Sequence, residues 1–203
     1  MHRLILPVIL LTSSLLQAQD IKVGLKGGYD IVSIHRIAQV NMLRSVQPLE
    51  ARNGYHAGFT VNVGLNNGFG FHFEPSFIRK GVIRGDEQKE TMSYLEVPIL
   101  FSVNPWKKLW IEAGPAAGFL LDANIELNGV VSPKPVTNER EISLVIGASW
   151  DVHDRINVGG RFARSLTTVW EIQFTNESGF ITDEFEEYNQ YLEFFLRVYL
   201  LDK

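Results

Sequence analysis

A histidine, a carboxylate and a hydroxyl stand at alternate positions of this sequence, at His72, Glu74 and Ser76. These are the residue types of a general base, its orienting acid and a nucleophile, so they could hydrolyse an ester. With a spacing of two along an extended strand, the outer pair lies too far apart for a compact triad. His56 could approach His72 across a hairpin, but two histidines without a further ligand make a poor metal site. We therefore predict no catalytic residue, no metal and no cofactor.

Charged residues of both signs recur on one face of the segments that surround this motif. Isolated charges on a buried face are costly, so these groups should pair with one another. The sequence predicts an internal network of ion pairs, and the alternative is a narrow pore lined by the same groups. The predicted interior charges are Lys22, Lys26, Glu74, Glu96, Glu112, Glu141, Arg161, Glu193 and Arg197.

The elements that carry these charges show the two-residue alternation of β-strands. In the last of them, Leu192, Phe194 and Leu196 alternate with Glu193 and Arg197. The 17 glycines and 13 phenylalanines also favour an all-β protein. Eight segments show the pattern, at residues 21–29, 55–65, 69–77, 94–104, 109–121, 141–151, 156–165 and 191–201.

The connections between these segments alternate in length. Tight turns are predicted at Asn66–Gly68, Pro105–Lys108 and Val152–Arg155, and long polar loops at 32–53, 81–92, 122–139 and 166–187. Short turns at one end and long loops at the other are typical of outer-membrane barrels. The sequence predicts an eight-stranded antiparallel up-and-down transmembrane β-barrel, with both termini in the periplasm.

Periodicity alone does not say which face is wet, since a soluble lipocalin-like binding barrel alternates in the same way. Three features favour lipid outside. The polar face is rich in glycine and sparse in charge, the apolar face is an uninterrupted series of Leu, Val, Ile and Phe, and aromatic rings gather near strand ends. The predicted membrane-interface aromatics are Trp106, Trp110 and Trp150 by the tight turns, and Tyr29 and Tyr55 by the long loops.

The 203 residues suffice for one domain. There is no cysteine, and a net charge of −4 gives no basic footprint for nucleic acid. Residues 1–19 combine a short basic start with an apolar stretch, which predicts a signal peptide, and the alternative is a single membrane anchor. The barrel domain is predicted at 20–203.

The last predicted loop, 166–187, is acidic and carries the aromatic residues Trp170, Phe174, Phe180 and Phe185. It is either a solvated hairpin above the membrane or a partner surface with aromatic anchors. The sequence does not separate these two hypotheses.

Several motifs in order resemble the PorT-like outer-membrane β-barrel family of Bacteroidetes. They are Glu74-Pro75 before Lys80-Gly81, then Tyr94-Leu95-Glu96-Val97-Pro98, then Ala113-Gly114-Pro115. The resemblance covers nearly all of the chain after residue 19 and implies an eight-stranded barrel in the outer membrane of a Gram-negative bacterium. A known member of that family takes part in protein secretion. Many such barrels have an aromatic residue as their last residue. This sequence ends in Lys203 instead, and Tyr199 is the aromatic residue nearest to its end.

The function expected from the sequence is therefore non-enzymatic. The chain is predicted to be a structural or accessory barrel of an envelope complex, for example in protein secretion, with outer-membrane lipid and complex subunits as its partners. The alternatives are a narrow pore, a lipid-modifying barrel enzyme and a soluble binding barrel.

Overall fold

The computed structural model describes residues 20–40, 43–48, 50–65, 68–84, 88–175 and 181–202. The predicted signal peptide lies outside these ranges. The described residues form twelve strands: β1 (Asp20–Val40), β2 (Leu43–Pro48), β3 (Glu50–Gly64), β4 (Phe69–Phe73), β5 (Ser76–Arg84), β6 (Gln88–Trp106), β7 (Leu109–Leu127), β8 (Val130–Pro133), β9 (Arg140–His153), β10 (Ile156–Ser165), β11 (Trp170–Thr175) and β12 (Ile181–Asp202).

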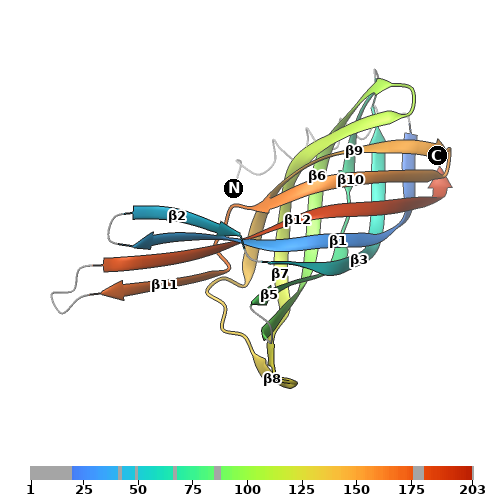
Figure 1. Ribbon diagram of the computed structural model, residues 1–203. Helices are drawn as coiled ribbons and strands as arrows, with labels where there is room; N and C mark the ends of the chain where they lie inside the picture. Colours follow the sequence, from blue (N-terminus) through green and yellow to red (C-terminus); the bar gives the residue numbers. More distant parts are fainter. Residues whose placement is uncertain are drawn as a thin grey trace, which may run out of the picture.

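The strands close into an antiparallel ring with eight positions, so the predicted fold is confirmed (Figure 1). The ring runs β1, β3, β4 with β5, β6, β7, β9, β10 and β12, and β12 pairs with β1. β4 and β5 share one position between β3 and β6. The chain is interrupted between them at Pro75, whose nitrogen has no hydrogen to donate to a neighbouring strand.

The facing residues of successive strands are staggered around the ring. We define a row as the residues met by stepping from each residue to the one that faces it on the next strand. The row that begins at Ile21 passes around the ring and returns to β1 at Ile31, ten residues further along the same strand. With a strand spacing of about 4.8 Å and a rise of about 3.3 Å per residue, this offset tilts eight strands by about 40°. Transmembrane barrels have tilts in this range. Between its ends the row passes through Val63, Phe71, Phe101, Ala113, Ile146, Phe162 and Leu192.

All the residues of this row are apolar and lie on the outer wall. Elsewhere on the wall, Phe59 is 62% exposed and Leu144 55%, whereas their neighbours Thr60 and Ser143 are buried inside. An apolar band around a whole ring is far larger than the apolar patches of soluble monomers. Among the described residues, no helix has the length and hydropathy to cross a membrane.

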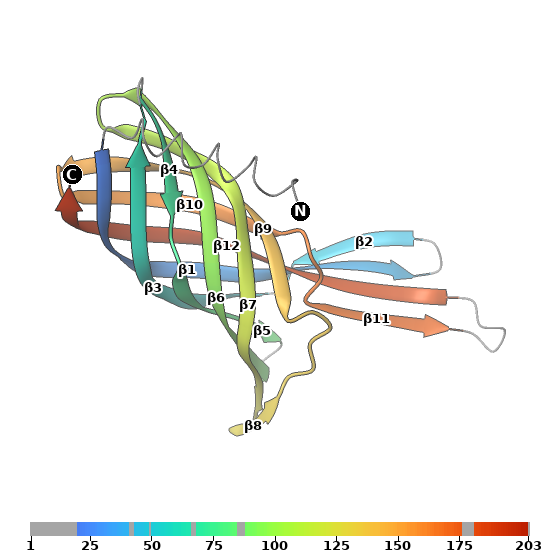
Figure 2. The same ribbon diagram turned by 180° about the vertical axis from the view of Figure 1, so that it is seen from behind.

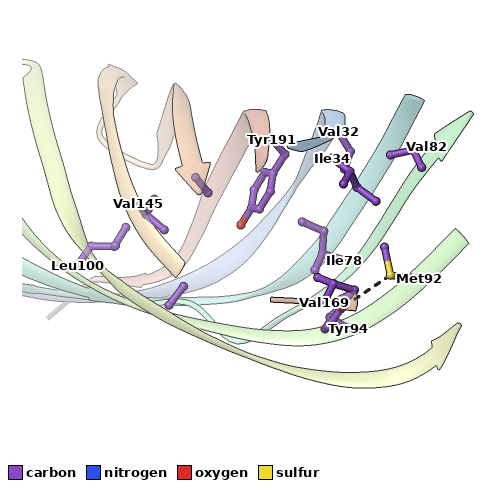
Figure 3. Packing of buried hydrophobic residues seen from close by; sticks show 12 residues of the cluster. Val32, Ile34, Ile78, Val82, Met92, Tyr94, Leu100, Val145, Val169 and Tyr191 are labelled. Atoms are coloured by element: carbon purple, nitrogen blue, oxygen red, sulfur yellow. Dashed lines mark hydrogen bonds between the residues drawn. The ribbon is translucent and has the colours of Figure 1, made fainter. Parts of the chain in front are cut away.

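The ring also encloses an apolar cluster, which the sequence analysis did not predict (Figure 3). The expectation was an interior of small residues and paired charges. The cluster includes residues beyond the predicted strand ends, whose alternation was assigned to loops. Its members are Val32, Ile34, Ile78, Val82, Met92, Tyr94, Leu100, Ala116, Val145, Ala163, Val169 and Tyr191.

The segments predicted to be long loops are largely strands, and that prediction was wrong. β1 continues to Val40, β7 continues to Leu127, and β6 begins at Gln88. Outside an apolar environment a strand needs no apolar face, because pairing with its neighbour satisfies the backbone. The extensions therefore lack a continuous apolar outer face, and the apolar residues of their inner face, such as Val32 and Ile34, were assigned to loops.

Two short strands and the ends of two long ones project beyond the ring as one sheet (Figures 1 and 2). We call it the blade and define it as β2, β11, residues 35–40 of β1 and residues 183–187 of β12. β1 and β12 pair at its centre, β2 flanks β1, and β11 flanks β12. The blade lies at the end of the ring opposite the tight turns (Figure 1).

The tight turns and both described ends of the chain lie together at the other end. Lys22 faces Asp202 across the pairing of β1 and β12. The amide of Tyr199 donates to the carbonyl of Arg155 in the turn between β9 and β10. The side chain of Tyr199 is buried inside the ring of strands, so its aromatic group does not face outward.

Candidate functional site

Six of the predicted interior charges meet inside the ring. We call Lys26, Glu74, Glu112, Arg161, Glu193 and Arg197 the central network, and each is at most 5% exposed. Arg197 donates from Nη1 and Nη2 to the two oxygens of Glu112, each at 2.8 Å, and from Nε to Glu74 at 2.7 Å. Arg161 donates to the other oxygen of Glu74 at 2.6 Å. The Nζ atom of Lys26 lies 2.6 Å from Glu193 and 3.1 Å from Glu74.

An aromatic ring lies at the centre of these cations. The ring centroid of Phe195 is 4.4 Å from the guanidinium of Arg197, 4.5 Å from that of Arg161 and 5.1 Å from Lys26 Nζ. Cation–π attraction adds to the ion pairs at such distances, more so away from water. Three cations thus face three carboxylates around the ring of Phe195. The alternation of the last strand placed Phe195 on the inner face between Glu193 and Arg197, but it did not show which cations would meet it.

A second buried cluster contains Glu96 and Glu141, which the sequence analysis named, and Lys80, which it missed. Lys80 Nζ donates to Glu96 at 2.8 Å and to Glu141 at 2.7 Å. The rings of Tyr94 and Tyr191 lie on it, at 4.9 and 4.6 Å. Continuing the alternation from Glu74 through the predicted strand end at residue 77 would have placed Lys80 on the inner face.

The ninth predicted interior charge, Lys22, lies apart from both clusters. It is partly exposed at the tight-turn end, 3.5 Å from Asp20 and 3.7 Å from Asp202. Its ion pairs join the first and last strands at the rim of the ring.

The structure gives His72 a hydroxyl partner that sequence spacing did not reveal. His72 Nε2 lies 3.1 Å from Ser102 Oγ on β6, and Nδ1 lies 3.8 Å from Glu74. Ser76 bonds instead to the carbonyl of Glu74. These are the residue types of a hydrolase, but Ser102 is fully buried and Glu74 is held by the two arginines of the central network. The arrangement leaves the serine inaccessible to a lipid or protein substrate.

One buried group has the residue types of a metal site. Ligand atoms of Asp30, His56 and Glu193 lie within 4.8 Å of one another. His56 Nδ1 is 3.0 Å from Asp30, and Glu193 is paired with Lys26. Both carboxylates therefore already have nitrogen partners, and the group is part of the packed interior.

Four of the five predicted interface aromatics lie at the two ends of the outer wall. Near the tight turns, Trp106 is 70% exposed and Trp150 47%. The prediction was wrong for Trp110, which faces the buried Ser149 on the inner face, is half-buried and donates to Asp151 at 2.8 Å. Nearer the blade, Tyr29 and Tyr55 face each other on β1 and β3, and both are exposed.

The predicted partner residues lie on the blade or beside it rather than in a loop. Phe174 on β11 and Phe185 on β12 contact edge to face, with centroids 6.1 Å apart. Trp170 lines a cavity of about 230 Å³ at the mouth of the ring with Arg36 and Lys134. Phe180 lies outside the described residues.

Ion pairs also bridge the strands near this mouth. Lys134, which follows β8, is buried and forms an ion pair with Glu90 of β6. Arg36 donates to Glu187 from Nε at 3.0 Å and from Nη2 at 2.7 Å, which joins β1 to β12 at the base of the blade. Together with the apolar cluster and the central network, these pairs occupy much of the described interior.

Two solved structures share this architecture. The outer membrane protein OprG from Pseudomonas aeruginosa aligns with a TM-score of 0.54 at 9% identity, over 92% of this chain and 97% of that one. Neisserial surface protein A aligns with a TM-score of 0.51 at 11% identity, over 86% of this chain and 96% of that one. At such low identity the likeness shows the fold alone. No curated protein matches the sequence.

A family model agrees with the fold. Residues 17–171, more than half of the chain, match the model described as outer membrane protein beta-barrel domain. The match is broader than the PorT-like family of Bacteroidetes that the motifs resemble. It agrees with the closed ring, the apolar outer wall and the aromatic residues at both of its ends. The chain belongs to the family of outer membrane protein beta-barrel domains.

Proposed function

We propose that this outer-membrane barrel is a non-enzymatic anchor that holds the blade out of the membrane as a docking surface for a protein partner. The observation that carries the proposal is the contrast between the two parts of the molecule. The described interior is filled by paired charges and apolar side chains, whereas the blade presents open strand edges.

The interior supports an anchoring role rather than catalysis or transport. The hydroxyl and imidazole groups that could react, Ser102 and His72, are buried at 0 and 1% exposure. An eight-stranded barrel is just wide enough for side chains to fill its interior. The central network fills it with matched charges, so its role is to stabilise the ring.

The blade has the features of a peptide-docking surface. Among the described residues, β11 pairs only with β12 and β2 only with β1, so each has one edge without a partner strand, although the amide of Glu171 on β11 donates to Thr137 Oγ1. A free edge can accept a strand from another chain by main-chain hydrogen bonds. On one face of the blade Phe174 is 48% exposed, and on the other face Gln173 donates to the carboxylates of Glu171 and Glu184. The partner that fits is an extended segment with basic and apolar side chains.

We place the blade outside the cell and the tight turns with both termini in the periplasm. Support comes from the family's usual arrangement of short periplasmic turns, and residues 1–19 would serve as the signal peptide for export. The resemblance to PorT-like barrels supports an accessory role in an envelope complex such as a secretion system.

The test is site-specific cross-linking in intact cells. A photo-reactive residue at Phe174, on the blade, is compared with one at Asn128, in the turn between β7 and β8. Affinity capture from the outer-membrane fraction, followed by mass spectrometry, identifies each adduct. We expect one defined protein adduct from Phe174 and none from Asn128.

Equal adducts from both positions would indicate random proximity and would contradict a docking role. Absence of adducts from Phe174 and from several other blade positions would reject the docking role and support a purely structural one. Capture of secretion subunits would identify the complex.

A further inference from the structure

The outer wall changes from apolar to polar in one step near the blade end of β5, β6 and β7. Phe77, Leu95 and Phe119 face one another across these strands, and all are exposed. Two residues further along β5, Arg79 faces Ser93, which in turn faces Asp122. Since charged side chains on the lipid face are destabilising, this step marks the edge of the hydrocarbon region.

The wall is hollowed at this edge. A cavity of about 320 Å³ is lined in part by Tyr55, Phe77 and Arg79. A second cavity of about 150 Å³ shares Tyr55, Arg79 and Thr91 with the first and adds Arg52. We call the two together the edge groove. Its apolar side is formed by the rings of Tyr55 and Phe77, whose centroids are 6.3 Å apart.

Two arginines in the edge groove have no carboxylate partner among the described residues. Arg52 extends from β3 across Gly81 and donates from Nη1 to the carbonyl of Glu90 at 3.2 Å and to Thr91 Oγ1 at 2.8 Å. The guanidinium of exposed Arg79 has no hydrogen-bond or ion-pair partner in the described part of the chain. Lys89, which lies nearby, does have a carboxylate partner, because its Nζ atom lies 3.9 Å from Glu126 Oε1.

Two uncompensated guanidinium groups beside an apolar wall define the chemistry of the ligand. The planar fork of arginine matches the oxygens of a phosphate, and such charge-assisted bonds are strong where water is scarce. The rings of Tyr55 and Phe77 offer an adjoining surface for hydrocarbon. Lys89, Asp122 and Glu126 also line the first cavity, and the carboxylates would disfavour a phosphate anywhere but beside the cations.

We propose that the edge groove binds the phosphorylated headgroup of a glycolipid in the outer leaflet. Arg52 and Arg79 hold the phosphate, and Phe77 contacts the acyl chains where they leave the sugar. The inference rests on the orientation given under the proposed function, which places this edge of the ring in the outer leaflet.

The experiment uses the folded full-length barrel in detergent micelles. Binding of bisphosphorylated lipid A, of the same lipid after removal of its phosphates, and of phosphatidylglycerol is measured by native mass spectrometry. The test variant is the double substitution Arg52→Gln with Arg79→Gln. Arg155→Gln, an exposed arginine at the tight-turn end, is the matched control.

We expect the test variant to bind bisphosphorylated lipid A at least about tenfold more weakly, since it loses charge-assisted bonds to phosphate. The control should bind like the parent, and Arg79→Lys should retain part of the affinity. Folding of each variant is checked by its far-ultraviolet circular dichroism.

Three results would overturn the inference: equal binding of the dephosphorylated lipid, equal binding of phosphatidylglycerol, or an equal loss in Arg155→Gln. The micelle assay does not involve the blade. Loss of cross-links at Phe174 with intact lipid binding would therefore reject the proposed function alone, and the converse result would reject the lipid site alone.

Discussion

Arg197 and Glu112 form a two-pronged ion pair across the interior of the ring, with each nitrogen of the pair 2.8 Å from its own carboxylate oxygen. Arg197 belongs to the last strand and Glu112 to β7, and both are fully buried. The pair therefore crosses the interior between two strands that are three positions apart in the ring. The pair matters for stability because burying either charge without the other would be unfavourable.

Removing one partner of this pair should be strongly destabilising. We expect Glu112→Ala or Arg197→Ala to lower the free energy of unfolding by about 3–5 kcal/mol, because each leaves the buried central network with one unbalanced charge. The double variant should lose less than the sum of the two single losses. Urea unfolding of the barrel in lipid vesicles measures all three values, and strictly additive losses would show that the two groups do not interact.

An arginine placed on the outer wall should report the depth of the membrane. Ile146 lies on β9 between Arg140 and Trp150 and is 56% exposed. Ile146→Arg should cost about 2–4 kcal/mol, as at a bilayer midplane. Val130 on β8 is 66% exposed but beyond the band, so Val130→Arg should cost about 0–1 kcal/mol. The same unfolding assay applies, and equal costs would contradict a lipid-covered wall.

A glycine on β9 allows Arg161 to reach the central network. A Cβ on Gly147 would lie 2.4 Å from Arg161 Cγ and 2.4 Å from the carbonyl oxygen of Gly160. Gly147→Ala should therefore destabilise the barrel by about 1–3 kcal/mol, as overpacking does. Gly160→Ala is the matched control, since its nearest contact would be an ordinary 3.6 Å. Thermal unfolding in detergent compares the two variants. Similar melting temperatures would contradict a steric requirement for glycine at position 147.

The sequence revealed the strands wherever one of their faces meets lipid. Phe194 and Leu196 alternate with Glu193 and Arg197 because one set faces hydrocarbon and the other faces the packed interior. Beyond the membrane edge that contrast disappears, so β11 and the extensions of β1 and β12 read as loops.

The interior was only partly predictable for a different reason. Alternation tells which residues point inward, but the register between strands decides which of them meet. Ser102 reaches His72 because β4 and β6 pair at a particular offset, and nothing local to either strand encodes it. The same holds for Lys134, which enters the interior from a segment after β8.

The orientation of the barrel can be tested with single cysteines, because the chain has no cysteine of its own. Asn128→Cys lies in the turn between β7 and β8, and Lys107→Cys in the tight turn between β6 and β7. A maleimide that does not cross membranes should label Asn128→Cys in intact cells and Lys107→Cys only after lysis. The reverse pattern would place the blade in the periplasm.

A filled interior should not conduct ions. The central network and the apolar cluster occupy the ring, so the purified barrel in planar bilayers should give no conductance steps above the lipid background. A larger porin in the same bilayers serves as the positive control. Discrete steps from the barrel would favour the narrow pore that the sequence left as an alternative.

The central network also has a consequence for the order of assembly. β12 contributes Arg197 and Glu193, and it pairs with β1, the first strand. Before that seam forms, Glu74 and Glu112 lack the guanidinium of Arg197 and share that of Arg161. Because β12 brings one cation and one carboxylate, the charges of the central network balance before and after docking, but only docking of the final strand completes the ion pairs of Glu74 and Glu112. Closure of the seam and completion of these buried ion pairs are therefore one event, and partly closed forms should be short-lived.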